Sequence, residues 1–375
     1  MVSVVNVNWC ETLSRLHEYV VPDLGVKFID RELEFEKLIK HYCRGDAPWI
    51  HVITGPWGCG KTQFARAMTY ALQFSSDYVV FYVNLSEEEL DRVFYPTKPE
   101  LQDLVIKLVI EVLGGTVLKL PTNLYRFVKY VVERLRVRGK IFLVIIDEIT
   151  RSLDQYRVSI RDYVASLSLK IYDISNEYSC TFYPILLTSD QTATELFIRE
   201  RGKNLSTHLL WNLPKEALTE LLQLLNSPLD TAVVWYITGG NPREVLLLMR
   251  EYRWELIPYI DARVRDVVSV IAEYIRDVGI SIDEVIHQCR VAVENPDYLS
   301  YQRFWNYLLR YNVAMYVDAR LHRLSTIDRC EWIGEDCAFQ LPIYYWILRA
   351  IVDRRRLRVT ARDVLEVLRS RTNIF

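Results

Sequence analysis

The sequence contains no apolar run of about 18 residues, so it offers no candidate for a membrane-spanning helix. The apolar residues at its start soon meet charged ones, which argues against a secretory signal there. Glycine and proline are scarce, at 13 each among 375 residues, and this favours a compact protein with few long loops. We therefore expect a cytoplasmic protein that does not bind a membrane.

Neither the cysteines nor the net charge points to a specialised class of protein. The seven cysteines have no repeated spacing, and Cys330 and Cys337 form no Cys-x-x-Cys pair, so we expect no zinc site. The formal net charge is −2, so any contact with nucleic acid must come from a local basic patch. The length predicts about two to three domains of ~100–200 residues each.

One stretch, residues 49–66 (WIHVITGPWGCGKTQFAR), carries the clearest chemical pattern in the chain. Its apolar start predicts a buried strand, and the loop that follows fits G-x-x-x-x-G-K-[ST] before a helix begins. The glycines let the backbone N–H groups and the helix N-terminus point at phosphates. Lys61 can reach the β- and γ-phosphates, and the Thr62 hydroxyl can hold Mg²⁺.

A glycine turn that carries a lysine by chance is the competing interpretation of this loop. The strand before it and the helix after it favour phosphate binding. The sequence therefore indicates a nucleotide-binding protein. The residues expected to bind the nucleotide here are Gly55, Pro56, Trp57, Gly58, Cys59, Gly60, Lys61, Thr62 and Gln63, and Lys61 is also expected to act in catalysis.

A second apolar run, 141–146, leads directly into Asp147 and Glu148. A continuous apolar run of this length suits a parallel strand that is buried on both faces. Asp147 would accept hydrogen bonds from Mg²⁺-bound water or from a neighbouring hydroxyl, and Glu148 would polarise the attacking water. Such a strand is common by itself. Together with the upstream phosphate loop it predicts ATP hydrolysis with Mg²⁺ held by Thr62 and Asp147.

The remaining pattern up to about residue 225 alternates strands and helices. Residues 181–187 predict a strand, and Pro184 inside it indicates a bend or an edge position. Thr188, Ser189 and Asp190 follow, and they either touch the γ-phosphate and position water or cap the next helix. Further strands are expected at 78–84 and 208–213, a polar connection at 86–100, and helices at 9–20, 101–113, 123–137, 157–178 and 214–225.

These features together resemble the archaeal ATPase family, in the additional-strand catalytic-glutamate class of P-loop ATPases, which is related to STAND and origin-recognition AAA+ ATPases. One further strand lies between the phosphate-loop strand and the Asp-Glu strand, and a glutamate directly follows the aspartate. The resemblance covers roughly residues 26–250. It is carried by Phe28-Ile-Asp-Arg-Glu, Gly55–Thr62, Asp147-Glu148, Arg199-Glu-Arg201-Gly and Gly239-Gly-Asn-Pro-Arg243.

The resemblance implies roles for six residues outside the phosphate loop. Phe28 and Arg31 would lie near the adenine. Pro242 or Arg243 would sense the nucleotide from a helical lid, in addition to the helix-ending turn that Gly239 to Pro242 predicts by itself. Arg201, or Arg199 beside it, would act as an arginine finger on its own site or on that of a neighbouring subunit. Solvated arginines on a helix are the alternative.

The C-terminal third carries no catalytic pattern. Helices are expected at 255–278, 281–293, 299–311, 341–352 and 360–370, and strands at 313–317 and 329–339 would form a hairpin turning near Gly334. Helices leading into a two-stranded ribbon are typical of a winged helix, which relatives of the family often carry. Residues 352–375 hold seven arginines against three carboxylates, a basic patch that can contact phosphates or remain a solvated surface.

The sequence thus predicts an α/β protein with three parts. Residues 1–213 would form a parallel-sheet P-loop AAA+-like core, 214–254 a helical lid, and 255–375 a mostly helical, winged-helix-like domain. The leading functional hypothesis is an ATP- and Mg²⁺-dependent switch whose C-terminal domain binds duplex DNA. The alternatives are a signalling ATPase with a protein partner and a nucleotide-dependent oligomer, or a P-loop kinase of small molecules, which would require a short arginine-bearing lid.

Overall fold

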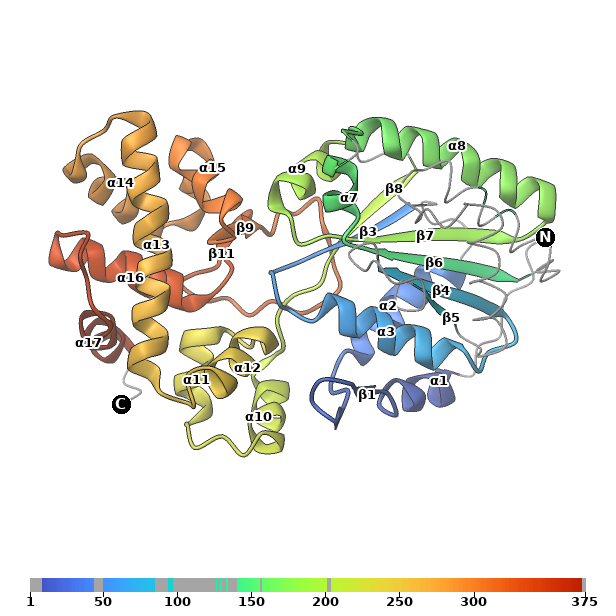
Figure 1. Cartoon of the computed structure of the whole chain (residues 1–375), viewed down its shortest axis with the longest axis horizontal. Helices are drawn as coiled ribbons and strands as arrows, with labels where there is room; N and C mark the ends of the chain where they lie inside the picture. The colour runs from blue at the N-terminus through green and yellow to red at the C-terminus, as the bar shows by residue number, and fades with distance from the viewer. Residues whose placement is uncertain are drawn as a thin grey trace.

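The computed structural model describes residues 9–43, 50–84, 94–96, 126, 129, 133, 140–155, 157–200 and 204–372. Figure 1 shows a sheet sandwiched between helices beside a second, mainly helical body. The α/β class with a parallel sheet and a helical C-terminal part is confirmed. Within the described ranges, no helix is both long enough and apolar enough to cross a bilayer.

The central sheet has seven strands in the order β10-β8-β3-β7-β6-β4-β5, parallel except for β5 against β4. The strands are β3 (Ile50–Thr54), β4 (Tyr78–Asn84), β5 (Phe94–Pro96), β6 (Ile141–Asp147), β7 (Thr181–Leu187), β8 (Leu205–Leu209) and β10 (His322–Arg323). The carboxyl ends of β3, β6 and β7 therefore meet at one edge of the sheet, which is where ligands bind in open parallel sheets.

Three expectations about the strands change in the structure. The strand expected at 208–213 is β8, which ends at Leu209 because its pairing with β3 stops at Thr54. Pro184 lies in a central strand rather than at an edge or bend. Its missing N–H is tolerated because the pairing of β7 with β3 begins only at Ile185. Two described strands, β4 and β5, rather than one lie between β3 and β6 in the sequence, and β7 lies between them in the sheet.

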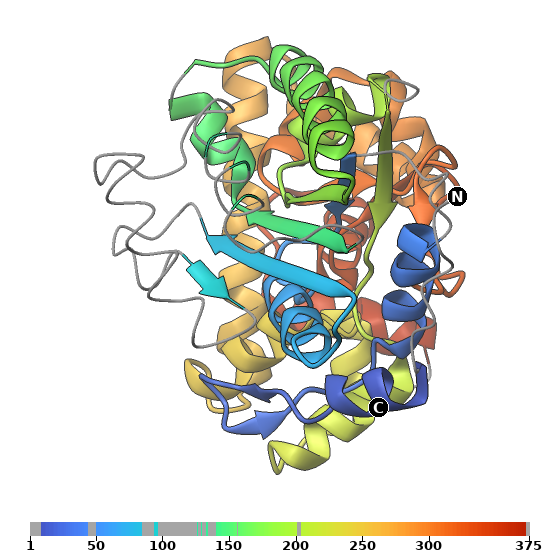
Figure 2. The ribbon, with the colours of Figure 1, turned by 90° about the vertical axis from the view of Figure 1, so that its right-hand side faces the viewer.

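Both faces of the sheet are covered by helices (Figures 1 and 2). Alternate residues of β6 serve the two faces: Phe142 and Val144 pack under α8 (Ile160–Tyr178), whereas Leu143 and Ile145 pack toward α1 (Trp9–Leu16), α2 (Glu32–Cys43) and α3 (Lys61–Leu72). Helices α7 (Ile149–Gln155) and α9 (Gln191–Arg199) follow β6 and β7. The expected helices at 101–113 and 123–137 and the connection at 86–100 lie outside the described residues, apart from isolated positions and β5.

Three short helices, α10 (Lys215–Leu224), α11 (Thr231–Thr238) and α12 (Pro242–Arg250), form what we call the lid helices. Gly239 ends α11 in a left-handed conformation, with φ at 61°. The Asn241 side chain accepts the Glu244 N–H at the start of α12, and Pro242 takes the first helical position. The turn predicted for this segment is therefore confirmed.

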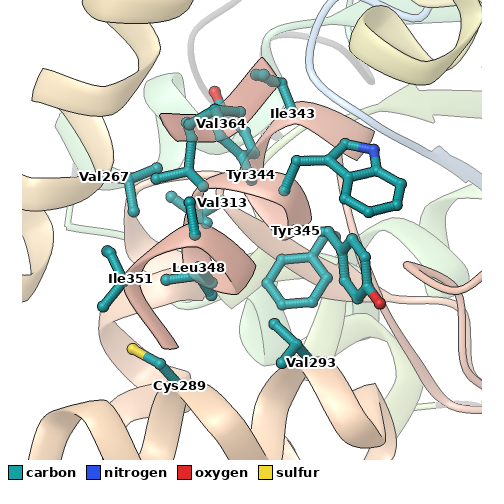
Figure 3. Packing of buried hydrophobic residues seen from close by; sticks show 14 of the residues in the cluster. Val267, Cys289, Val293, Val313, Ile343, Tyr344, Tyr345, Leu348, Ile351 and Val364 are labelled. Atoms are coloured by element: carbon teal, nitrogen blue, oxygen red, sulfur yellow. The ribbon is translucent and has the colours of Figure 1, made fainter. Parts of the chain in front are cut away.

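The C-terminal body comprises α13 (Leu256–Val278), α14 (Ile282–Glu294), η1 (Pro296–Tyr301), α15 (Arg303–Arg310), β9 (Ala314–Tyr316), β11 (Cys337–Phe339), α16 (Pro342–Arg354) and α17 (Ala361–Thr372). Helix α16 is its centre, and Figure 3 shows Tyr345 and Leu348 of α16 packed among residues of α14 such as Val293. Val233 and Ile237 of the lid helix α11 belong to the same apolar cluster. Lid helices α11 and α12 thus share an apolar core with the C-terminal body, whereas α10 packs against them in a separate cluster.

The expected hairpin of β9 and β11 is present, but its strands are shorter than predicted. The segment between them does not simply turn near Gly334, since it returns to the core and adds β10 to the edge of the central sheet beside β8. Lys37 of α2 donates to the Leu324 carbonyl at 2.5 Å, and the Trp211 N–H donates to the Ser325 hydroxyl at 3.0 Å. These contacts and β10 therefore hold the C-terminal body against the β8 edge of the central sheet.

Candidate functional site

The phosphate loop connects the end of β3 to the start of α3. Two of its glycines are required by close contacts: a Cβ on Gly55 would lie 2.0 Å from the Leu210 carbonyl oxygen, and a Cβ on Gly58 would lie 2.6 Å from Cβ of Arg243. Gly60 precedes α3 with φ at 98°, a conformation that L residues rarely adopt. The loop geometry therefore explains the glycine spacing of the motif, and the helix N-terminus lies where phosphates would bind.

Lys61 is buried, and its ammonium donates to the carbonyl oxygens of Gly55 and Pro56, each at 3.0 Å. These carbonyls belong to the same loop that would hold the phosphates. The ammonium is therefore held above the loop by weak neutral acceptors, which a phosphate oxygen can replace with a charged one.

Thr62 and Asp147 meet as the sequence predicts. The Thr62 hydroxyl donates to Asp147 Oδ2 at 2.7 Å, and the Tyr82 hydroxyl donates to the same oxygen at 2.7 Å. Burial, reinforced by the Asp147 carboxylate, raises the pKa of Tyr82 far above its ordinary value, so the phenol stays protonated and keeps donating. A hydroxyl and a carboxylate side by side are the hard oxygen donors that fit Mg²⁺.

Glu148 follows β6 with φ at 57°, and its N–H donates to Asp147 Oδ1 at 3.0 Å. A left-handed residue other than glycine is uncommon, and such strain is often found at functional sites. Glu148 lines a cavity of about 310 Å³ whose wall also includes Lys61, Thr62, Asp147, Ser189 and Arg243. The predicted catalytic carboxylate thus shares one space with the residues predicted to hold phosphate and metal.

The three polar residues after β7 have separate roles. Asp190 caps α9, since its carboxylate accepts the N–H groups of Thr192 and Ala193. The Thr188 hydroxyl is buried and accepts the Asp190 N–H at 3.1 Å. Ser189 is the one of the three that lines the cavity beside Glu148. The helix-cap interpretation therefore applies to Asp190, and Ser189 lines the cavity that Glu148 and Lys61 also line, whereas Thr188 is buried behind it.

The lid helices contact the phosphate loop directly. The Arg243 guanidinium lies over the Trp57 ring, and the Asn241 amide donates to the Trp57 carbonyl at 3.0 Å. From the other side, the Trp57 N–H donates to Gln340 Oε1 at 2.8 Å. Pro242 and Arg243 both line the cavity of about 310 Å³ that Lys61 and Glu148 also line, which we call the phosphate cavity. Trp57 is therefore held by the lid and by the C-terminal body at once.

A second, mostly apolar cavity of about 150 Å³ lies on the other side of the loop and is lined by Phe28, Gln63 and Pro242. The Tyr19 hydroxyl donates to Gln63 Oε1 at 3.0 Å, which orients that side chain. Apolar walls with a few polar groups suit a flat heterocyclic base. The placement of Phe28, Gln63 and Pro242 around one cavity agrees with their predicted nucleotide contacts.

Arg31 also borders this cavity, but its guanidinium is buried and fully engaged with the protein. It donates to the carbonyl oxygens of Cys59 at 3.0 Å and Trp211 at 2.8 Å, and it pairs with Glu34 at 2.9 Å. Burial alone would raise the pKa of Glu34, but the Arg31 charge and a hydrogen bond from Ser325 lower it below its ordinary value. Arg31 thus supports the phosphate loop from behind.

Arg199, one of the two arginines expected as finger candidates, lines neither cavity. Arg199 is exposed at the end of α9 and pairs with Glu195 four residues earlier. Arg201 lies outside the described residues. The solvated alternative therefore describes Arg199 within this chain.

Sequence reasoning missed three residues of this site. Tyr82 faces Asp147 because strands β4 and β6 pair in register. The alternation of side chains along β4 could have indicated from the sequence which face of the sheet Tyr82 lies on. Tyr19 and Gln340 reach Gln63 and Trp57 from distant parts of the chain, and no local pattern marks either residue.

A known protein family and several known proteins are similar to this chain. A family described as an ATPase domain predominantly from Archaea matches residues 28–248. An uncharacterized ATP-binding protein of Pyrococcus horikoshii is 26% identical over 245 residues, which cover 57% of this chain and 72% of that protein.

Among solved structures, ORC2 of Aeropyrum pernix in its ADP form aligns with a TM-score of 0.44 at 18% identity and covers 74% of this chain and 76% of its own. A STAND protein of Pyrococcus horikoshii with a tetratricopeptide repeat sensor aligns with a TM-score of 0.34 at 13% identity, over 92% of this chain and 46% of its own. The family match spans the phosphate loop, Asp147, Glu148 and the lid turn.

Proposed function

Because the chain belongs to the family of ATPase domains found predominantly in Archaea, we propose that it binds ATP, hydrolyses it with Mg²⁺ and works as a nucleotide-controlled switch. The observation that carries the proposal is the 2.7 Å contact of Thr62 with Asp147 beside Glu148, all on one cavity with Lys61. Membership of an ATPase family favours hydrolysis over phosphoryl transfer to a small molecule.

The proposed binding mode uses both cavities. The base occupies the apolar cavity at Phe28 and Gln63, and the phosphates follow the loop toward Lys61. Lys61 exchanges its two carbonyl acceptors for β- and γ-phosphate oxygens. Thr62 and Asp147 would hold Mg²⁺, which neutralises charge that develops on those oxygens when it is bound.

Hydrolysis then depends on Glu148. Its carboxylate accepts a proton from a water molecule while the water oxygen attacks the γ-phosphorus, and the bond to the β–γ bridging oxygen breaks. ATP and water thereby become ADP and phosphate. Ser189 lines the same space and can donate a hydrogen bond to the γ-phosphate or orient the water.

The test is Glu148→Gln, with Glu251→Gln on an exposed turn as the matched control. The substituted amide keeps the size of the side chain but cannot accept the proton, so we expect at least a ~10²-fold loss of turnover with ATP affinity preserved. Glu251→Gln should match the parental protein in both. Parental turnover in Glu148→Gln would remove Glu148 from the mechanism, and a parental protein without Mg²⁺-dependent turnover would refute the proposal.

We further propose that the nucleotide state moves the lid helices and the C-terminal body as one unit relative to the core. In this proposal the core ends near 213/214, and the lid helices pass into the C-terminal body near 254/255. Their shared apolar cluster supports this unit, and the Arg243–Trp57 contact links it to the loop. Three helices followed by the β9–β11 ribbon support a winged-helix-like body. The segment a wing would use, however, is docked on the core through β10.

The partner whose binding responds to this motion is either duplex DNA or a protein. The protein partner includes the case of further copies of this chain that assemble depending on the nucleotide. The basic end supports DNA only in part, because Arg354 and Arg356 both pair with Asp363. Arg355 and Arg358 are exposed and make no ion pair with any residue the structure describes. Arg362 is likewise exposed and makes no ion pair among the described residues. The DNA proposal therefore depends on these three side chains.

A further inference from the structure

A third cavity, of about 290 Å³, adjoins the phosphate cavity on the side of the catalytic carboxylate. Both cavities are lined by Trp57, Glu148 and Ser189. Two residues of the C-terminal body also line the third cavity: Arg310 at the end of α15 and Asn312 just after it. A residue far away in the sequence thus borders the space into which the γ-phosphate and the attacking water would project.

Apolar packing holds this part of the C-terminal body against the core. Ile198 of α9 and Trp211 share a buried cluster with Met315 of β9 and Ala338 of β11. Figure 1 shows α15 and β9 next to α9. The position of Arg310 beside the site is therefore set by a buried interface rather than by surface contacts.

A chain of hydrogen bonds links the end of α15 to the phosphate loop. Gln340 is buried, and its Oε1 accepts the Trp57 N–H at 2.8 Å. Its Nε2 donates to Asn312 Oδ1 at 3.2 Å, and Asn312 adopts a left-handed conformation with φ at 56°. Gln340 thus connects Trp57 to the side chain of Asn312, two residues after Arg310.

The Arg310 side chain is available for a ligand. It is 64% exposed, and its ion-pair partner Glu273 lies 3.8 Å away, which is beyond hydrogen-bond distance. The other charged residues that line this cavity, Glu148 and Asp190, are acidic, so Arg310 supplies its positive charge. By contrast, Arg199 is paired on its own helix and borders none of these cavities.

We propose that Arg310 acts on the nucleotide of its own chain, by donating hydrogen bonds to γ-phosphate oxygens during hydrolysis. The guanidinium leaves its weak contact with Glu273 and neutralises the charge that spreads over those oxygens as the bond to the leaving ADP breaks. Turnover then requires the C-terminal body to be docked, which couples hydrolysis to the position of that body. This inference rests on the proposed ATP hydrolysis.

The first experiment compares single-turnover ATP hydrolysis and ATP affinity in Arg310→Ala, Arg310→Lys and the control Arg276→Ala. Arg276 is 75% exposed on α13, and its nearest carboxylate is 3.9 Å away, so it matches Arg310 without bordering the site. We expect Arg310→Ala to lose about 10³-fold in rate with ATP affinity kept within about twofold. Arg310→Lys should recover part of the rate, and Arg276→Ala should equal the parental protein.

The outcomes separate this inference from the proposed function. An active parental protein with an equally active Arg310→Ala variant would overturn the role of Arg310 while leaving the ATPase proposal intact. A parental protein without turnover would remove both. A variant that binds ATP more weakly but hydrolyses bound ATP at the parental rate would show that Arg310 contributes to ground-state binding. That result would also overturn the inference.

A mixing experiment tests whether the arginine acts within its own chain. Arg310→Ala keeps Glu148, and Glu148→Gln keeps Arg310, so two chains that exchanged arginines would together form a complete site. We expect the mixture to remain as inactive as the separate variants. Restored turnover in the mixture would show that Arg310 acts across a subunit boundary, which would overturn its assignment to its own site.

Discussion

The guanidinium carbon of Arg243 lies 3.6 Å from the centre of the Trp57 ring, which joins lid helix α12 to the middle of the phosphate loop. A cation over an aromatic face at this distance is attracted by ~0.5–2 kcal/mol. The same arginine lines the phosphate cavity. The contact therefore makes the position of the lid sensitive to the conformation of the loop.

We expect Arg243→Ala to release nucleotide faster, by about tenfold, because the lid loses its hold on the loop and a cation leaves the cavity. Stopped-flow dissociation of a fluorescent ATP analogue measures this rate. Arg253→Ala, on the exposed turn after α12, is the control. Trp57→Phe should retain more of the contact than Trp57→Ala. Equal dissociation rates in Arg243→Ala and the parental protein would contradict a sensing role.

Tyr82→Phe tests how far Asp147, the proposed metal ligand, depends on the neighbouring tyrosine. The substitution removes the hydroxyl that donates to Asp147 at 2.7 Å, and a hydrogen bond to a charged group contributes about 1.5–3 kcal/mol. We expect the free energy of unfolding to fall by about that amount and the Mg²⁺ concentration for half-maximal turnover to rise. Urea unfolding and a Mg²⁺ titration measure the two effects.

Tyr163→Phe provides the control for this prediction. Tyr163 is also a buried tyrosine, on α8, and the structure gives its hydroxyl no hydrogen bond within the described residues. Its removal should change neither quantity by much. If Tyr82→Phe behaved like Tyr163→Phe, Asp147 would not depend on the tyrosine.

His208 should make stability depend on pH. It is fully buried, its Nε2 lies 2.8 Å from Nδ1 of His51, and the rings of His41 and His322 lie on its other sides. Burial, reinforced by those three rings, lowers the pKa of His208 well below its ordinary value. Below about pH 6.5 the unfolded chain binds a proton that the folded chain does not.

Stability is therefore fully present above about pH 6.5 and should fall at lower pH, by up to ~1.4 kcal/mol per pH unit for this one group. Urea unfolding at about pH 7.5 and 5.5 measures the change. His208→Gln should flatten the dependence, whereas the exposed control His287→Gln should leave it as in the parental protein. An equal slope in His208→Gln would exclude this histidine as the cause.

The exposed arginines of the C-terminal end test DNA binding. Arg355→Ser with Arg358→Ser should weaken duplex affinity for all sequences and reduce the log–log salt dependence by up to ~0.9 per lost phosphate contact. Turnover and stability should persist, since neither side chain has an ion-pair partner among the described residues. Arg356→Ser is the contrasting variant, because it breaks the pair with Asp363 and should lower stability instead.

Mobility shift with and without ATP, at low salt, measures duplex affinity directly. A parental protein with no duplex affinity in either state would end the DNA hypothesis and leave the protein-partner switch. Size-exclusion chromatography in the same two states would then show whether ATP changes the assembly of the chain.

The sequence by itself determined those parts of the site that depend on neighbouring residues. The phosphate loop is a local turn whose glycines, lysine and threonine have fixed spacing, so residues 55–62 were recognisable without coordinates. The strand before Asp147 and the turn before Pro242 are local for the same reason: apolar periodicity and turn chemistry are properties of consecutive residues. The nucleotide contacts predicted from these patterns lie around shared cavities.

Only the tertiary structure decided which distant residues complete the site. Arg31 donates to the loop and to Trp211 instead of facing the base freely, and Arg310 and Gln340 arrive from the C-terminal body. β10 joins the central sheet with only two residues, too few to show a period. These contacts join residues that are far apart in the chain. Their free energy comes from packing and burial in the folded protein, so they leave no pattern among neighbouring residues of the sequence.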